Sequence, residues 1–492
     1  MLFAGLVTLA IFRYITPYQF STVKGIQRSK PIFFKFDFYD LDKNGVEERL
    51  EFGNNTRGNR YFVKVNRDYR RGLIDQFNFQ APIIDDGFSR GYYDLNGDGV
   101  DEVFVFSNDN DYLYLSVIDI QQIKFLVKEK PILASSPQRA QQEWDISYLY
   151  PKFSDLDGDG KPELLFNVNS GYARLPRCLC VLDLQTMEVV KRFDHHMGAV
   201  NFEVMDLDQD GKKEIALGCS ATNNFSNQPD VFLSDAYSWL VLLDYRLNLL
   251  RKPFRIGEKF SGVSVYPVPA KPKPFFLAPT ILNKDFRLYV INSQGEISQK
   301  DTQHLSLTTG YYIYYQNSLP FIVCSTKDKL LIEYDHHLNI TRKFDLPEKI
   351  LANVLTVEDV LGDGKNEYFL KNVKGIYLLD DEGNTLAFYP TDFDLKRTQF
   401  HLVHSPGSRI PQVVLTPPSE VIELSLESSP LYGKLTLIFP GLLVIFYLLL
   451  MLGHLSLNKL HQYISFFLFS LRSSDNAIIL LNHNGKVLSV NQ

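Results

Sequence analysis

The sequence predicts an all-β fold built from a repeated unit, and three observations lead to this prediction. An acidic nine-residue loop appears at residues 40–48, 94–102, 155–163 and 206–214, so its copies begin 54, 61 and 51 residues apart. The chain contains 27 Tyr and 37 Phe, which suit strands. No long segment before residue 430 shows convincing helical periodicity. Repeats with this spacing are typical of propellers and solenoids.

The acidic loop is the first element of each repeat. Oxygens at loop positions 1, 3, 5 and 9 can surround one hard cation, and glycine at position 6 permits the turn that brings the carbonyl of position 7 to the same centre. We therefore expect Ca²⁺ sites with these ligands: Asp40, Asp42, Asn44, Val46, Glu48; Asp94, Asn96, Asp98, Val100, Glu102; Asp155, Asp157, Asp159, Lys161, Glu163; Asp206, Asp208, Asp210, Lys212, Glu214.

The flanks of the loop decide which kind of calcium site it is. A helix-loop-helix site has its closing Glu at position 12, whereas these loops have it at position 9 and lie between short aromatic and β-branched runs. Each loop is therefore expected to join two strands. An ordinary hairpin turn without metal is the alternative for any single copy, but four copies that keep position 9 favour calcium.

Degenerate copies extend the repeat to residue 415. One lies at residues 359–367, where Leu361 replaces the oxygen of position 3, and others are expected at 266–274, 314–323 and 404–415. A second hairpin alternates with the loop and consists of apolar residues, a polar turn and more alternating residues. Its apolar segments lie at 115–119, 178–183, 239–244, 288–292, 330–335 and 376–380. Two hairpins per repeat make the four strands of a propeller blade, so we expect an eight-bladed β-propeller, with seven blades as the alternative. Closure of the ring would require residues near 23–34 to supply the strand that follows 421–426.

The loop pattern, Asp-x-Asp-x-Asp-Gly-x-x-Glu in its complete form, resembles the FG-GAP/VCBS repeats of integrin-α-like propellers. The resemblance covers about residues 30–428 and is specific in the four complete loops, while the Phe-Gly and Gly-Ala-Pro phrases of the family are not cleanly present. It implies a propeller domain, taken as 23–428, with structural calcium sites on one rim and a partner-binding surface elsewhere. The formal net charge of −6 arises largely from the loop acids, and the chain has no basic stripe of the kind that binds nucleic acid.

The character of the chain changes after residue 430. Residues 435–455 contain no Asp, Glu, Lys or Arg and are long enough, at about 30 Å, to form a transmembrane helix. The apolar start, within residues 1–20, is expected to be a partial signal anchor or membrane span, and 456–472 a juxtamembrane linker helix with apolar residues at helical spacing. Residues 473–492 resemble the opening of a PAS domain, with one more propeller hairpin as the alternative.

These segments together resemble the front half of a membrane-bound sensor of the two-component, histidine-kinase type. We expect the propeller on the extracytoplasmic side of the cell membrane, the C-terminus in the cytoplasm, membrane lipid as one partner, a glycan, peptide or protein as the unknown ligand, and a possible homodimer. A membrane-anchored adhesion or surface-interaction protein is the main alternative. No catalytic motif is present, which makes a polysaccharide-active enzyme the weakest option. His195-His196 and His336-His337 are expected to be solvated turn residues, and the four cysteines are not expected to hold the fold together.

Overall fold

The computed structural model describes most of the chain in two units. The described residues are 16–27, 33–55, 60–67, 72–84, 86–137, 143–171, 174–224, 231–258, 261–271, 273–282, 285–300, 307–347, 351–391, 393–395, 398–404, 410–417, 420–472, 479–481 and 486–490. The larger unit is Phe20–Leu426, and the smaller comprises residues 1–19 and 427–492.

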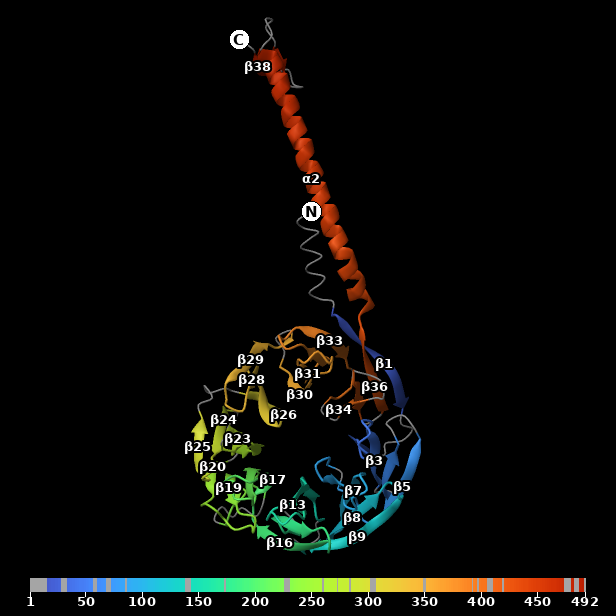
Figure 1. The fold of residues 1–492 in the computed structure, drawn as a ribbon, viewed down its shortest axis with the longest axis vertical. Coiled ribbons are helices and arrows are strands. Elements are labelled where there is room, and N and C mark those ends of the chain that lie inside the picture. The colour runs from blue at the N-terminus through green and yellow to red at the C-terminus, as the bar shows by residue number, and fades with distance from the viewer. Residues whose placement is uncertain are drawn as a thin grey trace. The chain divides into compact units, whose positions relative to one another are not determined.

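The larger unit consists of antiparallel sheets set around a common centre (Figure 1). Five sheets have four strands in the described part of the chain. They are β2 (Phe33–Tyr39) with β3 (Glu48–Asn55), β4 (Arg60–Asn66) and β5 (Leu73–Phe79); β6 (Arg90–Tyr93) with β7 (Glu102–Asn108), β8 (Tyr112–Asp119) and β9 (Lys124–Ala134); β26 (Leu307–Gln316) with β27 (Leu319–Thr326), β28 (Leu330–Tyr334) and β29 (Ile340–Asp345); β30 (Asn353–Glu358) with β31 (Glu367–Lys371), β32 (Gly375–Leu379) and β33 (Thr385–Pro390); and β34 (Gln399–Val403) with β35 (Gln412–Thr416), β36 (Glu420–Ser428) and β1 (Tyr18–Gln27).

Two larger sheets and one small pair complete this unit among the described residues. The five-stranded sheet contains β11 (Ile146–Ser147), β12 (Lys152–Ser154), β13 (Glu163–Ser170), β15 (Cys178–Asp183) and β16 (Glu188–Asp194). The nine-stranded sheet contains β17 (Gly198–Met205), β18 (Glu214–Ser220), β19 (Ser238–Leu243), β20 (Phe254–Gly257), β21 (Ser261–Val263), β22 (Tyr266–Val268), β23 (Phe275–Leu282), β24 (Asp285–Ile291) and β25 (Ile297–Lys300). The small pair is β10 (Ser136–Pro137) with β14 (Arg174–Leu175).

The burial of each strand follows its place in its sheet. The second strand β7 is buried at six of seven positions, because neighbouring sheets cover both of its faces. The outermost strand β16 alternates between exposed and half-buried residues, as expected of an edge that faces water on one side. In Figure 1, strands β7, β17, β26 and β30 lie toward the centre of the ring, and β9, β16 and β25 lie toward its outside.

The hydrophobic core lies between sheets that follow one another along the chain. One cluster joins Phe52 and Val63 of the first sheet to Val103 of the second, and the next joins Phe106 of the second to Phe166 of the five-stranded sheet. Each interface repeats the same face-to-face packing of apolar side chains. Antiparallel sheets that pack in this way around a ring make a β-propeller, and the predicted all-β propeller class is confirmed at this level.

The last sheet combines the two ends of the propeller sequence. Its order is β1-β36-β35-β34, so the N-terminal strand lies beside the C-terminal strand. The closing strand begins at Tyr18 and ends at Gln27, which is earlier than the expected range near 23–34, because the next strand, β2, belongs to the neighbouring sheet. The degenerate copies expected at 266–274, 314–323 and 404–415 fall on the hairpins β22–β23, β26–β27 and β34–β35, respectively.

The smaller unit contains one long helix and a hairpin. Helix α2 (Pro430–Arg472) has 43 residues and covers both the expected span at 435–455 and the expected linker at 456–472 without a break. Among the residues whose side chains the structure describes, no helix has the length and apolar character needed to cross a membrane. Strands β37 (Ile479–Leu481) and β38 (Val487–Val490) pair antiparallel. Residues 1–15 of the expected N-terminal anchor, and the rest of the 473–492 segment apart from Lys486, lie outside the described residues.

Candidate metal centres

Each of the four acidic loops joins two strands that pair with each other. The loops connect β2 to β3, β6 to β7, β12 to β13 and β17 to β18, and the Glu of position 9 is in every case the first residue of the second strand. The predicted placement of the loops between strands is therefore correct. The side chains that could bind a cation are held by the ends of two rigid strands.

The Asp at position 1 organises each turn by accepting backbone hydrogen bonds. Its Oδ2 accepts the N–H of the position 6 glycine at 2.8 to 3.1 Å in all four loops. These glycines have φ angles of +83° to +91°, a region that residues with a Cβ rarely adopt. The glycines are Gly45, Gly99, Gly160 and Gly211. The turn is thus held by hydrogen bonds within the loop itself.

Positions 5 and 9 complete the framework of the loop. The side-chain oxygen of position 5 accepts the N–H of position 7 at 2.8 to 2.9 Å. One carboxylate oxygen of the position 9 Glu accepts the N–H of position 2 at 2.6 to 3.0 Å. The sequence assigned this Glu only a ligand role, whereas the structure shows that it also fastens the start of the loop to the second strand.

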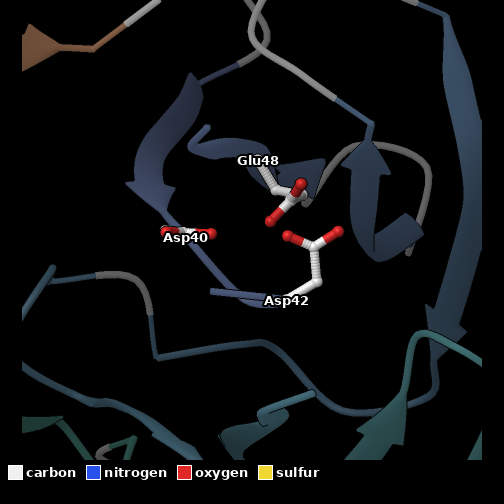
Figure 2. Close-up of side chains that lie close together, drawn as sticks. All are labelled: Asp40, Asp42 and Glu48. Carbon is white, nitrogen blue, oxygen red and sulfur yellow. The ribbon is translucent and has the colours of Figure 1, made fainter. Parts of the chain in front are cut away.

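Each loop brings carboxylates together, but the loop positions that supply them differ from one loop to another. In the first loop, oxygens of Asp40, Asp42 and Glu48 lie within 4.8 Å of one another. Figure 2 shows these three side chains gathered at one place, with Asp42 and Glu48 directed toward each other. The third and fourth loops gather positions 1, 3 and 5, which are Asp155, Asp157, Asp159 and Asp206, Asp208, Asp210.

The electrostatics of the loops favour a cation. Burial, followed by the nearby carboxylates of Asp42 and Asp40, raises the pKa of Glu48 to about 7, and burial raises the pKa of Glu214 to about 7 in the same way. Burial is also the main cause of the raised pKa values of Glu102 and Glu163. A divalent cation at these sites would offset the repulsion among the carboxylates.

Two buried carboxylate oxygens provide a direct test of fit. Oδ1 of Asp157 and Oδ1 of Asp206 are shielded from solvent and have no hydrogen-bond partner. An unpartnered buried carboxylate oxygen is costly, and coordination of a hard cation would satisfy it. The donor set is entirely oxygen, as calcium prefers. The residues of the third and fourth loops therefore fit Ca²⁺ well.

The degenerate loop at residues 359–367 keeps the hydrogen bonds of the complete loops and lacks their cluster of three carboxylates. Asp359, Asp363 and Glu367 accept the same backbone hydrogen bonds as in the complete loops. Leu361 occupies position 3, and this loop contributes no group of three neighbouring carboxylates among the described residues. The turn motif and the cation cluster are thus separable features of the sequence.

Asp119 is a residue near the second loop that the sequence reasoning missed. One of its oxygens lies within 4.8 Å of oxygens of Asp98 and Glu102, although it belongs to the next strand, β8. The pairing of Val103 with Ile118 places Asp119 opposite Glu102. The register of the β7–β8 hairpin is the only signal that could have revealed it.

Two other predictions about polar residues have different outcomes. His195 is 2% exposed and buried, so the prediction of a solvated turn residue is wrong for it. Its Nε2 lies 3.0 Å from Oδ1 of Asn167, and burial lowers its pKa to about 3. The four cysteines, at positions 178, 180, 219 and 324, are free and buried, in agreement with a fold that does not depend on disulfides.

Comparisons with known proteins give distant structural similarities. No protein-family model and no curated protein sequence matches the chain. The crystal structure of BBS1N in complex with ARL6DN, soaked with mercury, has a TM-score of 0.40 and 8% identity over 84% of this chain and 98% of that chain. BamB from Moraxella catarrhalis has a TM-score of 0.42 and 10% identity over 82% of this chain and 99% of that chain. The Dos1 propeller has a TM-score of 0.43 and 12% identity over 82% and 95%, respectively. At such values these structures say nothing about the function of this chain.

Proposed function

We propose that this chain is the ligand-sensing, extracytoplasmic propeller of a membrane-anchored signal-transduction receptor, with structural calcium sites of the FG-GAP/VCBS type. The observation that carries the proposal is the last sheet, in which β1 and β36 are neighbours. Both segments that leave the propeller therefore start from the same sheet. A change within that sheet would reach both expected membrane segments at once.

The numbers of strands in the sheets support eight blades. The five four-stranded sheets count as one blade each, the five-stranded sheet as another, and the nine-stranded sheet as two. This last division rests on β18 and β21, which are joined through a single residue pair, Ser220 with Gly262, whereas β18 and β19 share four pairs. A seven-bladed ring would require the nine-stranded sheet to act as one blade.

The proposed anchor rests on the sequence of α2. Residues 435–455 carry no formal charge, and 21 helical residues span about 30 Å, the thickness of the hydrocarbon core of a bilayer. The β37–β38 hairpin that follows has the two strands expected at the opening of a PAS domain. With the propeller outside the cell, this hairpin lies in the cytoplasm, and loops of modest charge bind calcium at extracellular concentrations.

The second half of α2 supports a homodimer. Leu457, Leu460, Ile464 and Phe467 are 48% to 64% exposed and are spaced three or four residues apart. This is the spacing of a coiled-coil seam, and a second copy of the same helix would cover it. Dimeric helices of this kind can transmit rotation or displacement from a sensing domain to a cytoplasmic domain.

Cysteine cross-linking of the full chain in membranes tests this arrangement. All four native cysteines are buried, so Leu460→Cys provides one reactive thiol on the proposed seam, and Lys459→Cys provides a matched thiol on the neighbouring position. We expect oxidation to produce covalent dimers from Leu460→Cys and few from Lys459→Cys. Equal cross-linking at both positions, or none at either, would refute the paired helix.

Protease protection tests the membrane topology in the same preparation. In intact cells that express the chain, external protease should digest the propeller and leave an epitope after Val490 intact. Digestion of the epitope without permeabilisation would overturn the proposed topology. An adhesion protein, the alternative function, predicts the same topology but no ordered seam in α2, so the two experiments together discriminate between the two functions.

A further inference from the structure

Asp119 is the most unusual carboxylate in the propeller outside the four loops. Its side chain is 1% exposed, and its Oδ2 is buried with no hydrogen-bond partner. Its Oδ1 accepts the N–H of Gln122 at 2.8 Å, which accounts for only one of the two oxygens. A buried carboxylate with an unused oxygen is costly unless something else binds there.

Equivalent residues in other sheets show how that oxygen is normally satisfied. Asp244, Asp335 and Asp380 also end the third strand of a sheet or follow it directly, and their Oδ1 atoms accept N–H groups of the following turn. Their Oδ2 atoms accept Nδ2 of an Asn four residues later, at 2.9 to 3.1 Å. Four residues after Asp119 the chain has Ile123, which has no donor in its side chain. The Asn that satisfies Oδ2 in those three sheets is thus missing at Asp119, which is buried.

The carboxylate of Asp119 lies beside the second acidic loop. Oxygens of Asp119, Asp98 and Glu102 lie within 4.8 Å of one another, a separation that a single hard cation can bridge. Glu102 is itself 2% exposed, and its pKa is raised by burial and by the nearby Asp119 carboxylate. Two buried carboxylates therefore converge on the same point from neighbouring strands.

The second loop lacks a carboxylate at position 3, and Asp119 would supply one in its place. Position 3 of this loop is Asn96, whose Nδ2 donates to Oε1 of Glu102 at 2.7 Å. Positions 1, 3, 5 and 9 therefore offer three carboxylates in this loop and four in the third and fourth loops. We propose that Asp119 is a calcium ligand of the second site, contributed by the neighbouring strand in place of the carboxylate that position 3 lacks. This assignment rests on the proposed calcium binding and adds a ligand from outside the loop motif.

Calcium titration of the full chain, by calorimetry, tests the assignment with Asp119→Asn. The Asn side chain keeps the acceptor for Gln122 and removes the charge. We expect one of the calcium sites to weaken by about tenfold to a hundredfold while the others are unchanged. Asp183→Asn is the matched control, because Asp183 ends the third strand of the next sheet, and its Oδ1 accepts the N–H groups of Gln185 and Thr186. Its titration should equal that of the wild type.

The outcomes separate the two proposals. If the wild-type chain binds no calcium, the proposed calcium function fails and the assignment fails with it. If the wild type binds calcium, Asp98→Asn weakens one site and Asp119→Asn weakens none, only the role of Asp119 is refuted.

A crystal grown with calcium gives a measurement that does not depend on the folding of a variant. An ion at the second loop should lie about 2.3 to 2.6 Å from an oxygen of Asp119. An ion that is bound by Asp94 and Asp98 but lies beyond coordination distance of Asp119 would overturn the assignment.

Discussion

Replacement of Asp157 by Asn in the third loop separates cation binding from the structure of the turn. Asp155 accepts N–H groups of the loop, so its replacement would damage the turn with or without calcium. Asp157 instead has a buried Oδ1 without a partner and lies within 4.8 Å of the Asp155 and Asp159 carboxylates. Asn has the same shape and removes one charge from this cluster. Without calcium, Asp157→Asn should therefore leave stability unchanged or raise it slightly.

The expected loss appears only when calcium is present. Extracellular loops of this kind bind calcium with dissociation constants of about 10⁻⁴ to 10⁻³ M, so about 10 mM calcium stabilises the folded chain by roughly 1.4 to 2.7 kcal/mol per site. Asp157→Asn should remove most of the contribution of one site. Urea unfolding of the full chain in EDTA and in calcium measures this contribution as the difference between the two free energies of unfolding.

Asp363→Asn in the degenerate loop is the matched control. Its Oδ1 accepts the N–H of Lys365 as position 5 does in the complete loops, but Leu361 removes position 3 from that loop. Its stability should respond to calcium as the wild type does. The reasoning is refuted if Asp157→Asn lowers stability equally in EDTA and in calcium, because Asp157 would then stabilise the turn itself.

Three further changes test other parts of the structure. Leu361→Asp should restore position 3 of the degenerate loop and add one bound calcium in a calorimetric titration; an unchanged number of sites would show that the turn alone does not define the site. Because the pKa of His195 is lowered from 6.5 to about 3, the unfolded chain binds a proton that the folded chain does not, so this residue should lower the free energy of unfolding by about 1.4 kcal/mol for each pH unit from 6.5 toward 3. His195→Gln keeps a donor for Asn167 and should flatten the dependence of the free energy of unfolding on pH, as measured by urea unfolding. An unaltered dependence would show that His195 is not its cause. Gly218→Ala would place a Cβ 2.6 Å from the carbonyl oxygen of Val263 and should lower the free energy of unfolding by about 1 to 3 kcal/mol. A melting temperature equal to that of the wild type would show that the two halves of the nine-stranded sheet separate easily.

The features that the sequence predicted correctly are those encoded within a few residues. The acidic loops need only a fixed spacing of oxygens and one glycine with positive φ, and both are visible in nine residues, as in the loop that ends at Glu48. The second hairpins could be recognised in the sequence because they recur at the same spacing as the loops. For this reason the position of every complete loop between two strands was predictable.

The features that the sequence did not predict depend on register and on packing between distant segments. Asp119 reaches the second loop only because β7 and β8 pair with a particular offset. His195 is buried, and its ring lies against Asn167, 28 residues earlier in the sequence, a contact that no local pattern shows. The closing strand begins at Tyr18 because ring closure, and not local composition, determines which N-terminal residues pair with β36.

Hydrogen bonds between neighbouring loops explain how cation binding in one loop could stiffen the contact between two adjacent sheets. The N–H at position 8 of the second loop, from Asp101, donates to the carbonyl of Leu41 in the first loop at 2.8 Å. Lys213 of the fourth loop donates in the same way to Leu156 of the third loop at 2.9 Å. Position 8 of the third loop is Pro162, which has no N–H and cannot make the equivalent bond to the second loop. The four loops are therefore linked as two pairs, and an ion that orders one loop also fixes the carbonyl or N–H that its paired neighbour uses, so calcium would act across the boundary between sheets and not only within a hairpin.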